Sequence, residues 1–364
     1  MTLRLATLVG TAILLASSLS APAQERVVNV YNWSDYIDPA ILEQFTKETG
    51  IKVVYDVYDS MEVLETKLLA GGSGYDIVVP TDRNLQRMIQ AGVLQPLDKS
   101  KIPNLSHMWP AITDRVATYD PENKFAVNYM WGTTGIGYNT QMIEKRLPNA
   151  PVNSMDMLFK PEVVSKFADC GVYLLDSPDD IMPAALAYLG LKPDSKEEAD
   201  LQKAADLVKS VRPYIRKFHS SEFIEALANG DACIAFGYSG DILQARDRAA
   251  EANNGVTIAY SIPKEGALLW TDSMAIPADA PHVAEAHEFI NFIQRPEIIA
   301  KATDFVNYPN GNLDSQKLIK PEILADKSIY PDDETLSHLY TTTPNDARTQ
   351  RTLTRLWTSV KTGQ

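Results

Sequence analysis

The sequence is poor in histidine and cysteine, with five histidines and two cysteines among 364 residues. No HExxH pattern, GxSxG elbow, Walker loop or dinucleotide fingerprint occurs in it. Neither cysteine has a second cysteine or a histidine at the spacing of zinc ligands. We therefore expect no catalytic residue, no metal site and no cofactor.

Basic residues are also scarce relative to acidic ones. The chain has 34 lysines and arginines against 47 aspartates and glutamates, a formal net charge of −13. An acidic protein repels the phosphate backbone, which argues against nucleic acid as a partner. The same balance favours cations as ligands, although most of these charges are expected at the solvated surface.

Long apolar runs are absent after the first residues. Arg4 precedes an apolar run from Leu5 to Leu19, and Ala21-Pro22-Ala23 fits the small-x-small cleavage pattern of an export signal. The alternative, a membrane anchor, would need about 20 apolar residues. We expect residues 1–23 to be a cleaved signal peptide and the rest, long enough for two domains, to be exported without inserting into a membrane.

Export also bears on the two cysteines, Cys170 and Cys233. In an oxidising compartment an even number of cysteines usually indicates a disulfide. Two buried free thiols remain the alternative.

The chain alternates strand and helix patterns, which predicts an α/β fold with a largely parallel sheet. Asp38 is expected to cap a helix that begins at Pro39 and ends at Gly50, and Asp59 with Glu62 resembles a capping box. Strands are expected at 27–31, 51–57, 75–79, 171–175 and 232–236, with helices from 177, over 194–209 and after 238–241. From about 321 we expect turns and short helices.

Ligands of such sheets bind outside the carboxyl ends of the strands. The segments that follow the expected strands are rich in aromatic rings and carboxylates: Trp33, Asp35, Tyr36, Asp179, Asp180, Tyr238, Asp241, Trp270 and Asp272. Rings and carboxylates together suit an ammonium group on an alkyl chain. Trp270 and Asp272 are two apart in a strand-like run, so they should face the same side.

Each candidate also has a plainer interpretation. Asp180 could complete a capping box with Ser177, and Asp241 could be an ordinary carboxylate at a helix N-terminus. Asp35 could form an Asx turn. Trp33 and Trp270 could be core residues, as large aromatic residues often are.

Five segments carry a resemblance to a known family: VYNWSDYIDP, KETGIKVVYDVYDS, GYDIVVP, YMWGTTGIGYN and SIPKEGA. They resemble the periplasmic putrescine-binding proteins of polyamine ABC importers. The resemblance implies a two-lobe periplasmic-binding-protein fold of type II, with lobe 1 at 24–134 plus about 262–310. Lobe 2 would be 135–261, with 311–364 packing on it and on the hinge, and the chain would cross near 135–138 and 258–262. It also implies a periplasmic monomer that passes its polyamine to a membrane permease.

The resemblance further implies a disulfide between Cys170 and Cys233 and a set of pocket residues: Trp33, Ser34, Asp35, Tyr36, Thr81, Asp180, Tyr238, Asp241, Trp270, Asp272 and Tyr308. The chain departs from the family pattern at three places. Tyr238 replaces a tryptophan, Trp270 replaces a phenylalanine, and Thr81-Asp82-Arg83 replaces a small uncharged stretch. Arg83 near the pocket would repel an additional ammonium.

Putrescine is the ligand that this pattern favours. The alternatives are spermidine or another diamine, then a sugar, then an exported carbohydrate-active enzyme. A receptor that feeds a sensor instead of a transporter would have the same sequence features.

Overall fold

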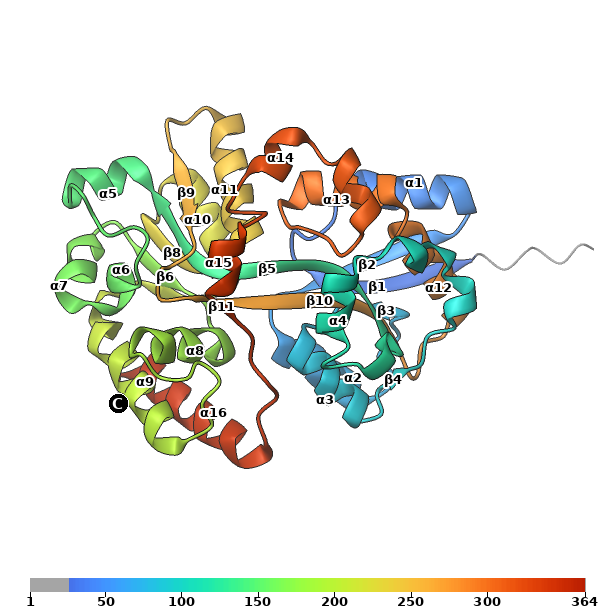
Figure 1. Cartoon of the computed structure of the whole chain (residues 1–364), viewed down its shortest axis with the longest axis horizontal. Helices are drawn as coiled ribbons and strands as arrows, with labels where there is room; N and C mark the ends of the chain where they lie inside the picture. The colour runs from blue at the N-terminus through green and yellow to red at the C-terminus, as the bar shows by residue number, and fades with distance from the viewer. Residues whose placement is uncertain (1–25, 364) are drawn as a thin grey trace, which may run out of the picture.

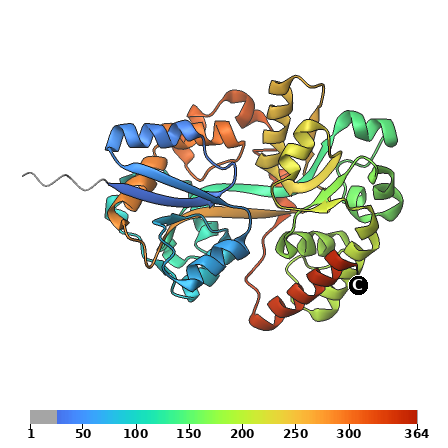
Figure 2. The same ribbon diagram turned by 180° about the vertical axis from the view of Figure 1, so that it is seen from behind.

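The computed structural model describes residues 26–363, so the expected signal peptide at 1–23 lies outside the described residues. The chain forms two α/β lobes joined by two long strands (Figure 1), and the same strands are seen from behind in Figure 2. One sheet extends through both lobes in the order β2-β1-β3-β10-β5-β8-β6-β7. The two-lobe α/β fold predicted from the sequence is thus confirmed.

The strands of the described residues are β1 (Val27–Trp33), β2 (Lys52–Tyr58), β3 (Ile77–Val78), β4 (Leu94–Gln95), β5 (Ala126–Asn139), β6 (Val172–Leu174), β7 (Lys217–Phe218), β8 (Ile234–Tyr238), β9 (Ile258–Ser261), β10 (Ala267–Pro277) and β11 (Leu339–Tyr340). The α-helices are α1 (Pro39–Thr49), α2 (Met61–Ala70), α3 (Asp82–Gln90), α4 (Pro110–Val116), α5 (Thr140–Arg146), α6 (Asp156–Phe159), α7 (Pro161–Val164), α8 (Pro178–Tyr188), α9 (Glu198–Val211), α10 (Phe223–Asn229), α11 (Ser239–Ala252), α12 (Val283–Ile293), α13 (Pro296–Val306), α14 (Pro321–Ala325), α15 (Asp333–Ser337) and α16 (Ala347–Thr362). Among residues 26–363 no helix has both the length and the apolar character required to cross a bilayer.

The first lobe begins with parallel pairing of β1 with β2 and of β1 with β3. Helix α1 joins β1 to β2 and starts and stops where the sequence predicts. The Asp38 side chain accepts a hydrogen bond from the backbone of Ala40, and Gly50 ends the helix in the left-handed conformation at φ 70°. The parallel pairing places the carboxyl ends of β1, β2 and β3 at one edge of the sheet.

The cap of helix α2 differs from the prediction by one residue. Ser60, in an extended conformation, accepts from the backbone N–H of Val63 with its hydroxyl, and the helix begins at Met61. The expected capping box of Asp59 with Glu62 is therefore wrong. Asp59 instead lines a cavity described below.

Strands β5 and β10 run antiparallel and connect the lobes (Figures 1 and 2). The first part of β5 pairs with β10, and its last part pairs with β8 on one side and β9 on the other. The crossing expected near 135–138 falls within β5. The one expected near 258–262 is misplaced, because β9 lies in the second lobe and the chain crosses back along β10. The exact division of the chain into lobes stays a prediction.

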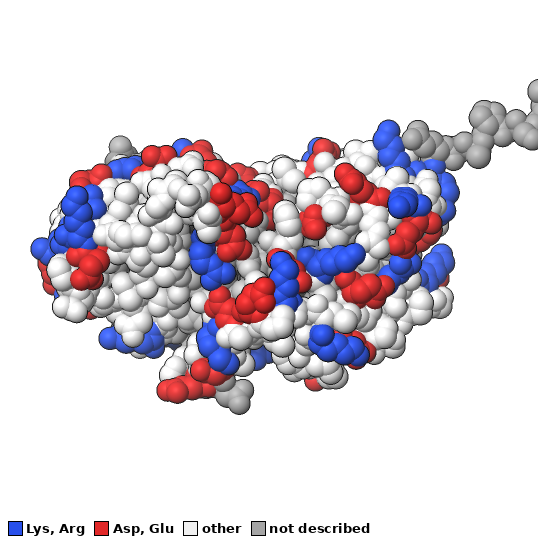
Figure 3. All heavy atoms as spheres, turned by 90° about the horizontal axis from the view of Figure 1, so that it is seen from above, with Lys and Arg blue, Asp and Glu red and all other residues white. Residues whose placement is uncertain are grey.

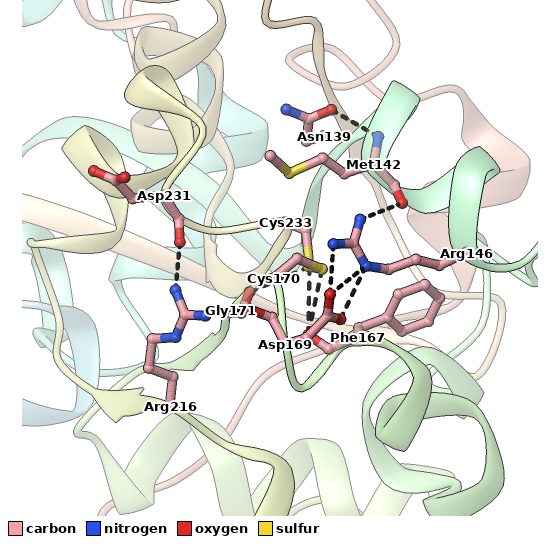
Figure 4. The surroundings of a disulfide bond; sticks show 10 residues. All are labelled: Asn139, Met142, Arg146, Phe167, Asp169, Cys170, Gly171, Arg216, Asp231 and Cys233. Carbon is pink, nitrogen blue, oxygen red and sulfur yellow. Dashed lines mark hydrogen bonds and ion pairs between the residues drawn. A yellow bond between two sulfur atoms is a disulfide. The ribbon is translucent and has the colours of Figure 1, made fainter.

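The second lobe has its own parallel sheet, in which β6 lies between β7 and β8. A disulfide joins Cys170, just before β6, to Cys233, just before β8, with their Cα atoms 5.5 Å apart (Figure 4). Arg146 pairs with Asp169 beside it, and the Arg216 guanidinium donates to the Asp231 carbonyl. The predicted disulfide is confirmed, and it fixes the starts of two adjacent strands.

The C-terminal segment connects the two lobes and ends in a longer helix than the sequence indicates. After β11, which pairs with β10, the Thr342 carbonyl accepts a hydrogen bond from Tyr119 of the first lobe. Thr343 then donates from both its backbone and its hydroxyl to Asp194 in the second lobe. Helix α16 packs against α9 and α8, as Figure 2 shows at the lower edge.

Candidate ligand-binding site

A cavity lies between the lobes at the carboxyl ends of the strands, and its volume together with the solvent at its mouth is about 810 Å³. Its walls come from β1, β2, α2 and α3 on one side and from α8, β8 and α11 on the other. Ten of the eleven residues implied by the family resemblance line it: Trp33, Ser34, Tyr36, Thr81, Asp180, Tyr238, Asp241, Trp270, Asp272 and Tyr308.

Asp35 is the expected residue that does not line the cavity. Its backbone is in the left-handed region at φ 56°, between neighbours that do face the cavity. The carboxylate lies 2.6 Å from the Arg248 guanidinium of α11, and 41 % of its side chain is exposed. Asp35 therefore joins the two lobes beside the cavity.

The Asp272 carboxylate is buried at the centre of one wall. It accepts hydrogen bonds from the Thr81 hydroxyl at 2.7 Å and from the Tyr36 hydroxyl at 2.9 Å. Burial raises the pKa of Asp272 to about 7, and the two hydroxyls partly oppose that shift. Strand β10 positions this group, since Trp270, two residues earlier, faces the same cavity as predicted.

Asp241 occupies the first turn of α11 and is held by Tyr308. The Tyr308 hydroxyl donates to the carboxylate at 2.8 Å and accepts from the Asp241 backbone N–H at 3.1 Å. A Cβ added to Gly240 would lie 2.4 Å from the Tyr308 ring, so glycine is required for this contact. Burial raises the pKa of Asp241 to about 7, even though it lies at a helix N-terminus.

Asp180 is the third buried carboxylate of the cavity. Ser177 donates its hydroxyl to this carboxylate at 2.6 Å, and Tyr238 donates at 3.3 Å. Ser177 is the N-cap residue of α8, yet its side chain makes no hydrogen bond to the helix backbone. The capping-box interpretation of Asp180 is therefore wrong, because the Ser177 hydroxyl donates to the Asp180 carboxylate and does not cap the helix backbone. Burial again raises the pKa of Asp180.

Aromatic rings from both lobes meet beside these carboxylates. The Trp270 ring lies edge-on to Tyr238 at 5.7 Å and to Tyr308 at 5.3 Å between centroids. Tyr36 lies edge-on to Tyr308, also at 5.3 Å. Tyr238 and Trp270 differ in ring size from the residues of the family pattern, yet they still enclose the cavity with aromatic rings. A channel with π faces along its length suits the methylenes and ammonium groups of an alkylamine.

The model of the bacterial extracellular solute-binding protein family matches residues 40–331 of this chain. The chain belongs to this family. The resemblance stated from the five sequence motifs is thus confirmed, and the cavity between the lobes is where a solute-binding protein of this fold would hold its ligand.

Individual binding proteins are similar over nearly the whole length. The chain is 52 % identical over 357 residues to the putrescine-binding periplasmic protein SpuD of Pseudomonas aeruginosa, and the match covers 97 % of each chain. It is 47 % identical to the putrescine-binding periplasmic protein PotF of Escherichia coli, over 98 % of this chain and 97 % of that protein. The crystal structure of the spermidine/putrescine substrate-binding protein PotD of Streptococcus pneumoniae superposes with a TM-score of 0.75 at 32 % identity, covering 93 % of this chain and 99 % of that one. These relatives carry the names of binding proteins, not of enzymes.

Several cavity residues of this solute-binding protein were not predicted from its sequence. Tyr58 is the last residue of β2 and Asp59 follows it, while Ser220 and Ser221 come shortly after β7. Both pairs therefore lie at the same sheet edge as the predicted residues. Ligands of such sheets bind outside the carboxyl ends of the strands, and this rule, which predicted Trp33 as a cavity residue, would also have found these four. Asn84, also not predicted, lines the cavity from the first turn of α3 beside Arg83, which the sequence analysis expects near the pocket.

The charge of the site and surface agrees with a cationic ligand. In the described part of the chain, seven carboxylates line the cavity: Asp59, Glu62, Asp176, Asp179, Asp180, Asp241 and Asp272. The described residues contain no cluster of three or more histidine, cysteine or acidic side chains arranged for a metal ion. The face drawn in Figure 3 carries acidic and basic side chains side by side, without the continuous basic field that nucleic acid favours.

Proposed function

We propose that this chain captures a small polyamine, putrescine first, in the periplasm and delivers it to the membrane permease of an ABC importer. The observation that carries the proposal is the burial of Asp180, Asp241 and Asp272 around one aromatic cavity between the lobes. The names of SpuD and PotF as putrescine-binding proteins support the choice of ligand. Export by removal of residues 1–23 and action as a monomer belong to the same proposal.

The energetics favour a ligand that is both charged and apolar. An ammonium 4 Å from a carboxylate gains about 4 kcal/mol at an effective dielectric constant of 20, before desolvation is subtracted. Each well-placed ring adds about 0.5 to 2 kcal/mol. The carboxylates therefore select the charged ends, and the rings select the length of the aliphatic chain between them.

Both lobes contribute to the cavity, so the ligand stabilises their closed arrangement. Asp272 and Trp270 come from a connecting strand, whereas Asp180 and Asp241 come from α8 and α11 of the second lobe. A ligand that contacts all of them makes interactions that separated lobes cannot offer. In this mechanism the permease recognises the closed surface.

A thermal-shift screen tests the proposal, because a ligand that binds only the folded state raises its melting temperature. The screen should contain putrescine, cadaverine, spermidine, glucose and galactose. We expect the diamines to raise the melting temperature in proportion to the logarithm of their concentration, and the sugars to leave it unchanged. A shift with sugars alone would show that the cavity binds hydroxyl-rich rings instead.

A further inference from the structure

The cavity contains a cation of the protein itself. Among the described residues that line it, Arg83 is the single lysine, arginine or histidine, and this side chain is only 8 % exposed. The same residue lines a second hollow of about 330 Å³ between α8, α9 and the segment after β11. Arg83 therefore forms part of the wall between the two spaces.

Two residues contact the Arg83 guanidinium, and a third accepts from its backbone. Its Nε lies 3.6 Å from the Asp179 carboxylate of α8, and its Nη1 donates to the Thr342 hydroxyl of the C-terminal segment at 3.2 Å. Asp82, buried beside it, accepts from the backbone of Arg83 and of Thr271. Burial lowers the pKa of Arg83, but the charges of Asp179, Asp180 and Asp82 together outweigh it and raise the pKa, so Arg83 stays a cation.

The buried carboxylates of the cavity divide into two groups by their partners. Asp179 and Asp180 share the positive charge of Arg83, which lowers the pKa of Asp180 against the effect of burial. Asp241 and Asp272 have hydroxyl groups as their hydrogen-bond partners in the cavity. Of the three buried carboxylates, Asp180 thus lies beside a fixed cation, whereas Asp241 and Asp272 make no ion pair with another residue of the described chain.

We infer that Arg83 occupies the place of a third ammonium and thereby selects a diamine over a triamine. The inference rests on the proposed polyamine function and deepens it. A third ammonium at this end would approach a guanidinium that cannot lose its proton, and like charges in a buried site repel strongly. The Thr342 hydroxyl, which lines the second hollow, accepts a hydrogen bond from Nη1 and helps to hold the guanidinium in this position.

Titration calorimetry with putrescine and spermidine tests this inference on the wild-type chain and three variants. Arg83→Gln removes the charge at similar volume, Arg83→Lys keeps the charge, and Arg87→Gln is the matched control. Arg87 lies one turn further along α3, pairs with Glu65 at 2.7 Å and is outside the cavity lining. The quantity compared is the ratio of spermidine to putrescine affinity.

We expect the wild-type chain to prefer putrescine and Arg83→Gln to raise the spermidine-to-putrescine ratio tenfold or more. Arg83→Lys and Arg87→Gln should keep the ratio within threefold of wild type. A smaller rise in Arg83→Gln overturns the inference. A wild-type chain that binds spermidine as tightly as putrescine also overturns the inference. This second comparison uses the wild-type chain alone and does not depend on whether a variant folds. A wild-type chain that binds neither amine instead contradicts the proposed polyamine function.

Discussion

The hydroxyl of Tyr36 donates a hydrogen bond to the carboxylate of Asp272 at 2.9 Å, although 236 positions separate the two residues. The bond joins the turn after β1 to the strand that connects the lobes. With the Thr81 hydroxyl on its other oxygen, Asp272 is aligned, and it has no positive partner among residues 26–363. The carboxylate is therefore prepared for a cation that the ligand must supply.

Replacing Asp272 by asparagine should weaken putrescine binding by more than tenfold, or about 1.4 kcal/mol, because the amide cannot neutralise an ammonium. Titration calorimetry measures the change. Asp279→Asn, on an exposed residue that bonds Ser73, is the matched control and should leave affinity unchanged. Equal affinity of Asp272→Asn and wild type would remove Asp272 from the site.

Asp35 should behave differently from Asp272. Its carboxylate pairs with Arg248 at the side of the cavity, and both side chains are about one-third exposed or more. Because water screens such an exposed pair, it stabilises the closed state by only about 0.5 kcal/mol. We expect Asp35→Asn to lower putrescine affinity less than threefold, and the double variant with Arg248→Gln to lower it no further. A loss above tenfold in Asp35→Asn alone would indicate direct ligand contact.

Putrescine affinity should rise with pH between about 5.5 and 8. Without ligand the pKa values of Asp241 and Asp272 are raised to about 7, so each is largely protonated below that pH. A dication favours their charged forms, and binding therefore releases protons. Calorimetry in buffers of different ionisation enthalpy measures the release, and Asp241→Asn with Asp272→Asn should abolish most of it. Affinity that falls as pH rises would contradict these shifts.

Removing the disulfide should destabilise the chain by about 4 kcal/mol, as the chain-entropy model gives for a separation of 63 residues. The double variant Cys170→Ala with Cys233→Ala, unfolded by urea, measures the loss. Putrescine affinity of the folded fraction should persist, because the bridge lies outside the cavity lining. An unchanged midpoint of unfolding would show that the bridge adds no stability.

Local signals explain how much of the fold could be predicted. Asp38, Pro39 and Gly50 mark a helix through contacts within a few residues, so their pattern suffices. Asp59 and Ser60 are adjacent residues that can both cap a helix, and only the observed backbone decides for Ser60. Helix α16 owes its stability to packing on α9, a contact that no local pattern shows.

In the site, too, local sequence predicts some features and long-range contacts decide the others. The two-residue spacing of Trp270 and Asp272 predicts a shared face, because strand side chains alternate. The outward direction of Asp35 depends on a left-handed backbone and on Arg248, more than 200 residues away. The burial of Arg83 likewise requires the C-terminal segment to fold over α3. Such long-range contacts leave no trace in the neighbouring sequence.

Polyamine binding is tested most directly by a calorimetric titration of the purified chain, without residues 1–23, with putrescine and, separately, with glucose and galactose at pH 7.5. We predict saturable one-to-one binding of putrescine and no heat of binding for either sugar. Binding of a sugar with none of putrescine would contradict the proposed function, since the buried carboxylates and rings would then bind an uncharged ligand.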